Sequence, residues 1–114
     1  MFEVRRTVLV SAAHSLTLPY ESKCRRLHGH NWRVTVICRA ESLDASGMVV
    51  DFSRIKSVVD ALDHANLNEV LRLSGEPVNP TAENIARCVA HAIGETCAEV
   101  RVEEVDGSVA IWTK

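Results

Sequence analysis

A thiol and two imidazoles lie within the seven residues that run from Cys24 to His30, and a third imidazole, His14, precedes them. In extended chain His28 and His30 would project to the same face, because side chains alternate with a period of two. Gly29 between them leaves the backbone free to approach another group closely. Three protein nitrogens with an open fourth position are the ligand set of catalytic zinc, so His14, His28 and His30 are candidate ligands. A closed structural site that adds Cys24 as fourth ligand is the alternative that spacing leaves open.

The size and composition of the chain indicate one small globular domain over residues 1–114. Apolar residues make up 46%, but only two Phe, two Trp and one Tyr are present. The core must therefore rest on Val, Ile, Leu and Ala, which is a thin supply for so short a chain. Association of subunits is expected for this reason.

Charge and hydropathy argue against nucleic-acid and membrane partners. The net charge is −2, both signs are mixed along the chain, and no apolar window is long enough to span a bilayer. The apolar run after Arg5-Arg6 is too short for a signal peptide. The four cysteines lack paired spacing, so reduced thiols in a cytoplasmic protein are expected. Three of them (Cys38, Cys88 and Cys97) are interpreted as small buried hydrophobic residues.

Hydrophobic periodicity predicts four strands and two helices. Residues 2–11 and 30–40 are typical of strands, followed by two helices whose apolar faces include Ile55 with Val59 and Ile85 with Val89. Two further strands are expected around Val100–Glu103 and over 108–113, joined by an Asp106-Gly107 turn. The order ββααββ predicts an antiparallel α+β domain with both helices on one face of a four-stranded sheet.

The ends of the two helices carry capping signals. Asp51 or Ser53 can cap the first helix. The second can begin at Asn79 with Pro80 in the first turn, or at Thr81, and Gly94 is expected to end it.

Five motifs occur in order along nearly the whole chain, and together they resemble the 6-pyruvoyl-tetrahydropterin synthase and 6-carboxytetrahydropterin synthase family. They are Ser11-Ala-Ala-His14, Cys24-x-x-x-His28-Gly-His30-Asn-Trp32, Gly47-Met-Val-Val-Asp-Phe52, Leu62-Asp-His-x-x-Leu-Asn68 and Asn79-Pro-Thr-Ala-Glu-Asn84. The resemblance implies the tunnelling fold, in which ββααββ subunits form a trimeric barrel that pairs into a homohexamer.

The resemblance also implies a role for each site residue. Zinc would bind His14, His28 and His30, and Cys24 would be the catalytic cysteine. Asp63 and His64 would form a catalytic pair, and Glu104 would anchor the pterin, with Glu103 as the alternative if the strand register shifts. On residue types alone, Asp63 and His64 could equally serve a helix end, and Glu104 could be an ordinary outward strand residue.

Two positions depart from the family's pattern. Val10 stands two residues before Ala-Ala-His, where an aromatic is usual, and Val105 stands where a threonine often follows the anchoring glutamate. Val105 bears on the contacts to the pterin, and neither change removes a catalytic group.

The expected function is that of a zinc-dependent lyase acting on 7,8-dihydroneopterin triphosphate. The expected product is 6-carboxytetrahydropterin, with loss of acetaldehyde and triphosphate, on the route to queuosine. The short chain and the compact segment from Cys24 to His28 favour this product over that of 6-pyruvoyl-tetrahydropterin synthase, which is the alternative. A non-catalytic pterin binder or a structural zinc protein is a third possibility, which the combination of Cys24, Asp63 and His64 disfavours.

Overall fold

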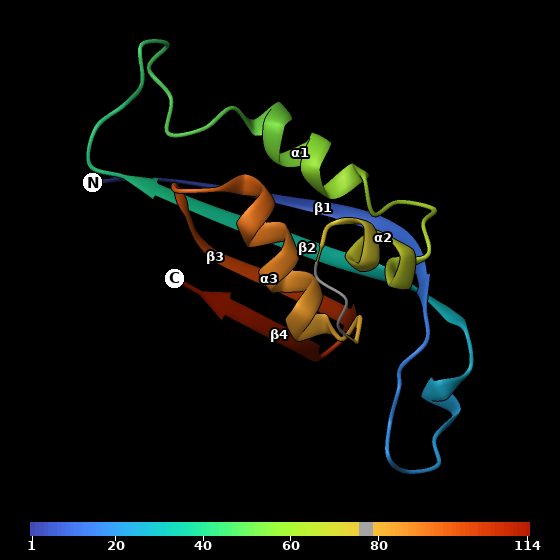
Figure 1. Cartoon of the computed structure of the whole chain (residues 1–114). Coiled ribbons are helices and arrows are strands. Elements are labelled where there is room, and N and C mark those ends of the chain that lie inside the picture. Colours follow the sequence, from blue (N-terminus) through green and yellow to red (C-terminus); the bar gives the residue numbers. More distant parts are fainter. Residues whose placement is uncertain (76–78) are drawn as a thin grey trace.

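Four antiparallel strands form one sheet, and the helices cover one of its faces (Figure 1). The computed structural model describes residues 1–75 and 79–114. Along the chain the elements are β1 (Phe2–His14), the 3-10 turn η1 (Lys23–Arg25), β2 (His28–Ala40), α1 (Phe52–Asp60), α2 (Leu67–Leu73), α3 (Ala82–Ile93), β3 (Cys97–Val105) and β4 (Ser108–Thr113). The sheet order β1-β2-β3-β4 follows the chain, so the predicted antiparallel α+β architecture is confirmed. No helix in the described part of the chain is long and apolar enough to cross a membrane.

The helical region differs from the prediction, because three helices stand where two were expected. The additional helix is α2, whose side-chain cap is Asn66, with an oxygen accepting the backbone N–H of Asn68 at 3.0 Å. Seven residues make only about two turns. An apolar face of that length does not repeat often enough to stand out in the sequence.

Both strands that carry the histidines are longer than predicted. β1 continues to His14, three residues beyond its predicted end, and β2 starts at His28 rather than at residue 30. The antiparallel register pairs His14 with His28 and Ala12 with His30. All three imidazoles therefore sit at the same end of two neighbouring strands, and His28 and His30 share a face as the period of two predicts.

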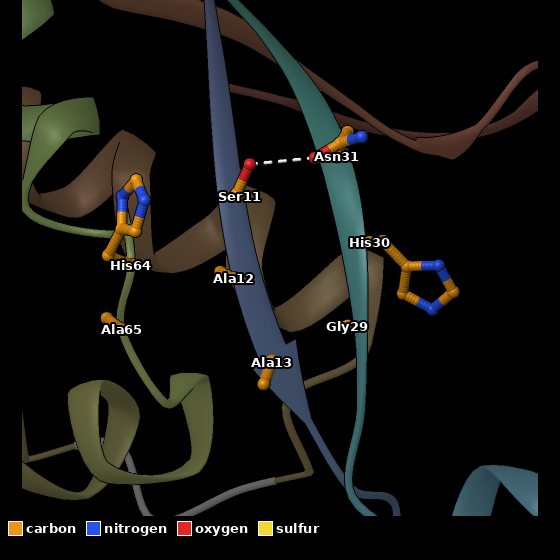
Figure 2. A pocket seen from close by; sticks show the side chains of 8 residues that line it. All are labelled: Ser11, Ala12, Ala13, Gly29, His30, Asn31, His64 and Ala65. Atoms are coloured by element: carbon orange, nitrogen blue, oxygen red, sulfur yellow. Dashed lines mark hydrogen bonds between the residues drawn. The ribbon is translucent and has the colours of Figure 1, made fainter.

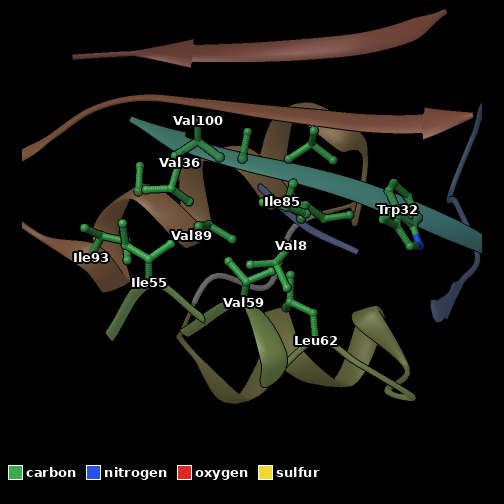
Figure 3. Packing of buried hydrophobic residues seen from close by; sticks show 14 of the residues in the cluster. Val8, Trp32, Val36, Ile55, Val59, Leu62, Ile85, Val89, Ile93 and Val100 are labelled. Atoms are coloured by element: carbon green, nitrogen blue, oxygen red, sulfur yellow. The ribbon is translucent and has the colours of Figure 1, made fainter. Parts of the chain in front are cut away.

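The core lies between the helices and the sheet (Figure 3). The predicted alternation along β2 is confirmed, because Trp32, Val34 and Val36 are all buried beneath the helices. Trp32 is the largest fully buried side chain; it lies two residues after His30, and its ring contacts those of His14 and His30. Aliphatic residues supply nearly all the rest, as the composition predicts.

The capping residues left open by the sequence are resolved. The carboxylate of Asp51 accepts the Ser53 N–H at 2.8 Å and caps α1. The hydroxyl of Thr81 accepts the Asn84 N–H at 3.2 Å, so α3 begins after Thr81. Gly94 ends α3 with a φ of 99°, a conformation that costs a glycine little.

Candidate functional site

Three histidines form a compact cluster where β1 ends and β2 begins. Their ring centroids are 4.6 Å apart for His14 and His28, 4.9 Å for His28 and His30, and 5.3 Å for His14 and His30. The rings of His14 and His30 also contact the edge or face of Trp32, whose indole N–H donates to the Ala12 carbonyl at 3.1 Å. The buried indole, held by this hydrogen bond, therefore packs against one side of the cluster.

Backbone carbonyls select the ring nitrogen that each of two histidines presents. The Nδ1 of His14 lies 2.7 Å from the Pro80 carbonyl, and the Nδ1 of His28 lies 2.7 Å from the Arg26 carbonyl. A carbonyl only accepts, so both Nδ1 atoms carry the proton and both Nε2 atoms keep a free lone pair. This is the arrangement in which proteins hold metal-binding imidazoles.

Glu104 is the acidic member of the cluster. Its Oε1 lies 3.1 Å from Nε2 of His14 and 3.0 Å from Nε2 of His30. Both nitrogens are nevertheless buried without a hydrogen bond of acceptable geometry, so proximity to Glu104 does not satisfy them. One ligand atom from each histidine and from Glu104 fits within 4.8 Å of the others. Buried, unsatisfied lone pairs at this spacing fit a metal ion.

The electrostatics of His30 favour the form that binds metal. Burial lowers the pKa of His30, and the neighbouring imidazoles of His28 and His14 act in the same direction, while Glu104 opposes them. A lowered pKa means that the neutral imidazole predominates near neutral pH. Metal binding requires this neutral form.

The structure places Glu104 and Glu103 on opposite faces of the sheet. Glu104 points to the side of the sheet that carries the histidines, whereas Glu103 lies on the other face with its Oε1 3.5 Å from Nε of Arg33. Of the two glutamates considered from the sequence, Glu104 is the one beside the cluster.

Two asparagines of the motifs hold the loop that follows His14, a role that the sequence did not predict for either of them. The side chain of Asn68 accepts the Ser15 N–H and donates to the Ser15 carbonyl, both at 2.9 Å. Asn79 makes the same two-point bridge to Thr17, with both distances 2.7 Å. A carboxamide matches one donor and one acceptor of an extended backbone at once. The asparagines of the Leu-Asn and Asn-Pro motifs are the sequence signal for these bridges, since an asparagine side chain can bind loop backbone in this way.

Cys24 lies in η1, between β1 and β2, and its carbonyl accepts the N–H of Leu16 at 2.9 Å. A cavity of about 390 Å³ is lined by Lys23, Cys24, Arg26, Leu27, His28 and His30, and we name it the thiol cavity. The thiol is partly exposed and does not belong to the group of possible metal ligands among the described residues. The geometry therefore places Cys24 beside the histidines rather than among the ligands.

Asp63 and His64 form a hydrogen-bonded pair at a second cavity. Nδ1 of His64 lies 3.0 Å from Oδ2 of Asp63, whose Oδ1 accepts the Ser11 N–H at 2.9 Å. The bond from Ser11 and, after it, the bond from His64 lower the pKa of Asp63, so the carboxylate stays ionised. The backbone of His64 has a φ of 57°, which is uncommon outside glycine, and its N–H donates to the Ser11 carbonyl at 2.5 Å. The backbone N–H and carbonyl of Ser11 in β1 thus bind Asp63 and His64 respectively and fix the position of the pair.

The dyad cavity, as we name this second hollow of about 410 Å³, is lined by Ser11, Ala12, Ala13, Gly29, His30, Asn31, His64 and Ala65. Figure 2 shows His64 beside β1 and the ring of His30 beyond β2, on opposite sides of the two strands. Among residues 1–75 and 79–114, no hydrogen bond or ion pair joins Asp63 or His64 to Cys24 or Glu104. One chain brings together the histidines, Cys24 and Glu104, but it holds the Asp63–His64 pair apart from them.

Gly29 is not required by packing within one chain. A methyl group in place of its hydrogen would lie 3.7 Å from the Ala12 carbonyl oxygen, an ordinary contact, and the glycine has no positive φ. The close approach expected from the sequence therefore does not occur within the described part of the chain.

Comparison with known proteins bears on what this site does. The family described as 6-pyruvoyl tetrahydropterin synthase matches residues 3–114. The chain belongs to that family. The 6-carboxy-5,6,7,8-tetrahydropterin synthase of Bacillus subtilis is 29% identical, in a match spanning 97% of this chain and 84% of that protein. The protein of the same name from Synechocystis is 39% identical over 75% of this chain and 70% of its own length.

Solved structures of the family share the fold. The 6-pyruvoyl tetrahydropterin synthase of Caenorhabditis elegans superposes with a TM-score of 0.73 at 27% identity, over 99% of this chain and 95% of that one. The Plasmodium falciparum protein of the same name superposes with a TM-score of 0.65 at 19% identity, which shows likeness of fold alone.

Proposed function

We propose that this protein is a zinc-dependent 6-carboxy-5,6,7,8-tetrahydropterin synthase that converts 7,8-dihydroneopterin triphosphate to 6-carboxytetrahydropterin, acetaldehyde and triphosphate. The observation that carries the proposal is the three-histidine cluster, two members of which, His28 and His30, line a cavity with Cys24. The relatives in Bacillus subtilis and Synechocystis that bear this enzyme name support the choice of reaction.

The metal would be zinc held by His14, His28 and His30. Imidazole nitrogens suit zinc, and three of them leave a position for substrate. A zinc ion at this position would supply Lewis-acid polarisation of the substrate's side-chain hydroxyls. The chain's contribution is to present neutral imidazoles with fixed tautomers, which the carbonyls of Pro80 and Arg26 provide.

The pterin ring would bind beside Glu104. A third hollow, the edge cavity of about 540 Å³, is lined by Ala82, Glu83, Glu104, Gly107, Ser108, Val109, Ala110 and Ile111. Glu104 thus stands between this cavity and the histidines. A carboxylate can accept two parallel N–H bonds from the amino group and ring nitrogen of a pterin. Such an anchor would direct the side chain of the substrate toward the cluster.

Proton transfer would use Cys24 and the Asp63–His64 pair. The thiolate of Cys24 would take a carbon-bound proton from the substrate side chain in the thiol cavity. Asp63 fixes the proton of His64 on Nδ1, so Nε2 of His64 is the atom that would accept or deliver a proton. Since one chain holds His64 away from Cys24, the pair would serve the thiol cavity of another subunit within a homohexamer.

A second candidate is 6-pyruvoyl tetrahydropterin synthase activity, which the family description and the Caenorhabditis elegans neighbour favour. It would eliminate triphosphate and keep the carbon chain of the substrate. The residues around the cluster suit both reactions.

The deciding experiment is to incubate the zinc-loaded protein with 7,8-dihydroneopterin triphosphate and assay acetaldehyde together with the pterin product. We expect acetaldehyde and 6-carboxytetrahydropterin in equal amounts. Triphosphate without acetaldehyde would establish the pyruvoyl reaction instead. Tight pterin binding without turnover would leave only a binding protein. His28→Ala should abolish both metal content and turnover, and full metal content in that variant would refute the ligand assignment.

A further inference from the structure

Two thiols that the proposed reaction does not use lie opposite each other on β2 and β3, the two central strands, near one end of the sheet. The register of β2 and β3 pairs Cys38 with Cys97, at a bulge next to Ile37. Both are free cysteines, and their exposed fractions are 0% and 1%. Directly opposed residues of antiparallel strands have Cα atoms about 4.5–5.5 Å apart, which lies inside the range of about 4.4–6.8 Å that disulfides span.

The side chains of this pair already interact. The interaction with Cys97 lowers the pKa of the Cys38 thiol to about 7, while burial opposes it. The thiol of Cys97 itself donates to the Glu99 carbonyl, with sulfur and oxygen 3.9 Å apart. The interaction with Cys38 is the main reason that the pKa of Cys97 is raised. Cys38 is therefore the more readily ionised thiol of the two.

An opening leads toward the pair. A cavity of about 390 Å³ lies beside the end of α3, and its lining includes Gly94, Cys97, Trp112 and Lys114. The cavity brings a small oxidant beside Cys97, whose cross-strand partner is the more readily ionised Cys38. Cys38 is ten residues along β2 from His28, a distance of about 33 Å in extended chain, so the pair is remote from the histidine cluster.

We propose that Cys38 and Cys97 form a peroxide-oxidisable dithiol, a modification site distinct from the catalytic thiol. One sulfur attacks an oxygen of hydrogen peroxide, the O–O bond breaks, and hydroxide leaves with a sulfenic acid formed. The second sulfur attacks the first, the S–O bond breaks, and the S–S bond forms with loss of water. Two thiols and one peroxide thus give one disulfide and two waters. The bond would join the two central strands and close a long loop, so it stabilises the folded chain.

The test uses a Cys24→Ser/Cys88→Ser variant, in which only the two central thiols remain. The folded protein is treated with excess hydrogen peroxide, denatured and alkylated without reductant, and its peptides are mapped. We expect no alkylated thiol, a Cys38–Cys97 linked peptide within one chain, and unchanged metal content. The midpoint of thermal unfolding should rise by about 5 °C or more, because the closed loop is long.

The matched control adds Cys97→Ala to the same variant. It should show no linked peptide and no rise in the unfolding midpoint. The proposal is overturned if both thiols of the parent variant remain alkylatable while peroxide oxidises Cys24 in the unmodified protein. It is overturned equally if the linked peptides join different chains. These readouts do not depend on the reaction assigned to the histidine site.

Discussion

At the scale of single residues, the candidate site depends on which nitrogen of each histidine is free. The Pro80 and Arg26 carbonyls hold the Nδ1 protons of His14 and His28, so both rings present Nε2. Trp32 packs against two of the rings and limits their rotation. A cluster held in this way before metal arrives loses little conformational freedom on binding it.

Cys24 is predicted to move a proton rather than to bind the metal, because it lies outside the group of possible ligands. Cys24→Ala should keep its metal and its fold and should lose turnover by about 10²-fold or more. Metal content by elemental analysis and turnover by acetaldehyde release provide the measurements. Cys88→Ala, which removes another partly exposed thiol outside the thiol cavity, is the control and should behave as the unmodified protein. Loss of metal together with the Cys24 thiol would indicate a closed structural site instead.

Glu104 has two possible roles that one substitution can separate. As the pterin anchor, Glu104→Gln should keep the metal and raise the Michaelis constant, because an amide donor would face a donor of the pterin. As a metal ligand, which its position 3.0–3.1 Å from two Nε2 atoms allows, the same variant should bind metal more weakly. Chelator competition and steady-state kinetics on the same preparation distinguish the outcomes. Glu103→Gln, on the opposite face, should change neither quantity.

At the scale of elements, two strands supply the histidines and two asparagines hold the loop between them. The register that pairs His14 with His28 brings the ligands together without help from the helices. Asn68 lies in the first turn of α2 and Asn79 precedes α3, so residues at the starts of both helices hold a loop that is far from them in sequence. The short helix α2 therefore has a positioning role in addition to burying Leu67 and Leu71 in the core.

Asn79→Ala should weaken metal binding by about 10- to 100-fold, the usual effect of removing a group that supports a metal ligand. The side chain holds the backbone of Thr17, and the next residue's carbonyl holds His14, so the loss reaches the ligand through both connections. Competition with a chelator measures the affinity. Thr81→Ala removes the cap of the same helix and should cost about 1 kcal/mol of stability with no change in metal affinity. Equal affinities for the two variants would contradict the positioning role.

The antiparallel sheet and its helix-covered face could be predicted from alternating and helical periodicity, because β1, β2, β3 and the two longer helices bury repeated apolar positions. The extent of β1 and β2 could not, since His14 and His28 are polar residues at strand ends, where periodicity carries no signal. The helix α2 was missed because it is short. The histidines were found by their spacing, whereas the roles of Asn68 and Asn79 depend on backbone partners far away in sequence. Asp63 and His64 were found through the resemblance, and their separation from Cys24 emerges only in three dimensions.

At the scale of the whole molecule, a single chain leaves two strand edges unpaired and apolar side chains exposed on one face. Among the described strands β1 and β4 form open edges of the sheet, and the edge cavity is lined largely by β4. The face away from the helices exposes Leu9, Val109 and Ile111, with exposed fractions of 64%, 47% and 57%. Long unpaired edges and exposed apolar residues on one face favour pairing with further strands.

The assembly proposal makes a prediction about which residues share a pocket. One chain groups Cys24 with Glu104 around the histidines and holds His64 at a separate cavity.

If a neighbouring subunit supplies His64, co-expressing Cys24→Ala and His64→Ala chains should restore activity, since some pockets combine the intact thiol of one chain with the intact imidazole of the other. Random mixing in a cyclic assembly restores about a quarter of the pockets. The pair Cys24→Ala and His28→Ala is the control and should restore none, because both residues line the same thiol cavity. Absence of rescue in the first pair, with mixed oligomers demonstrated by differently tagged chains, would place Cys24 and His64 in one subunit's pocket. A fully active monomer in sedimentation at micromolar concentration would defeat the assembly altogether.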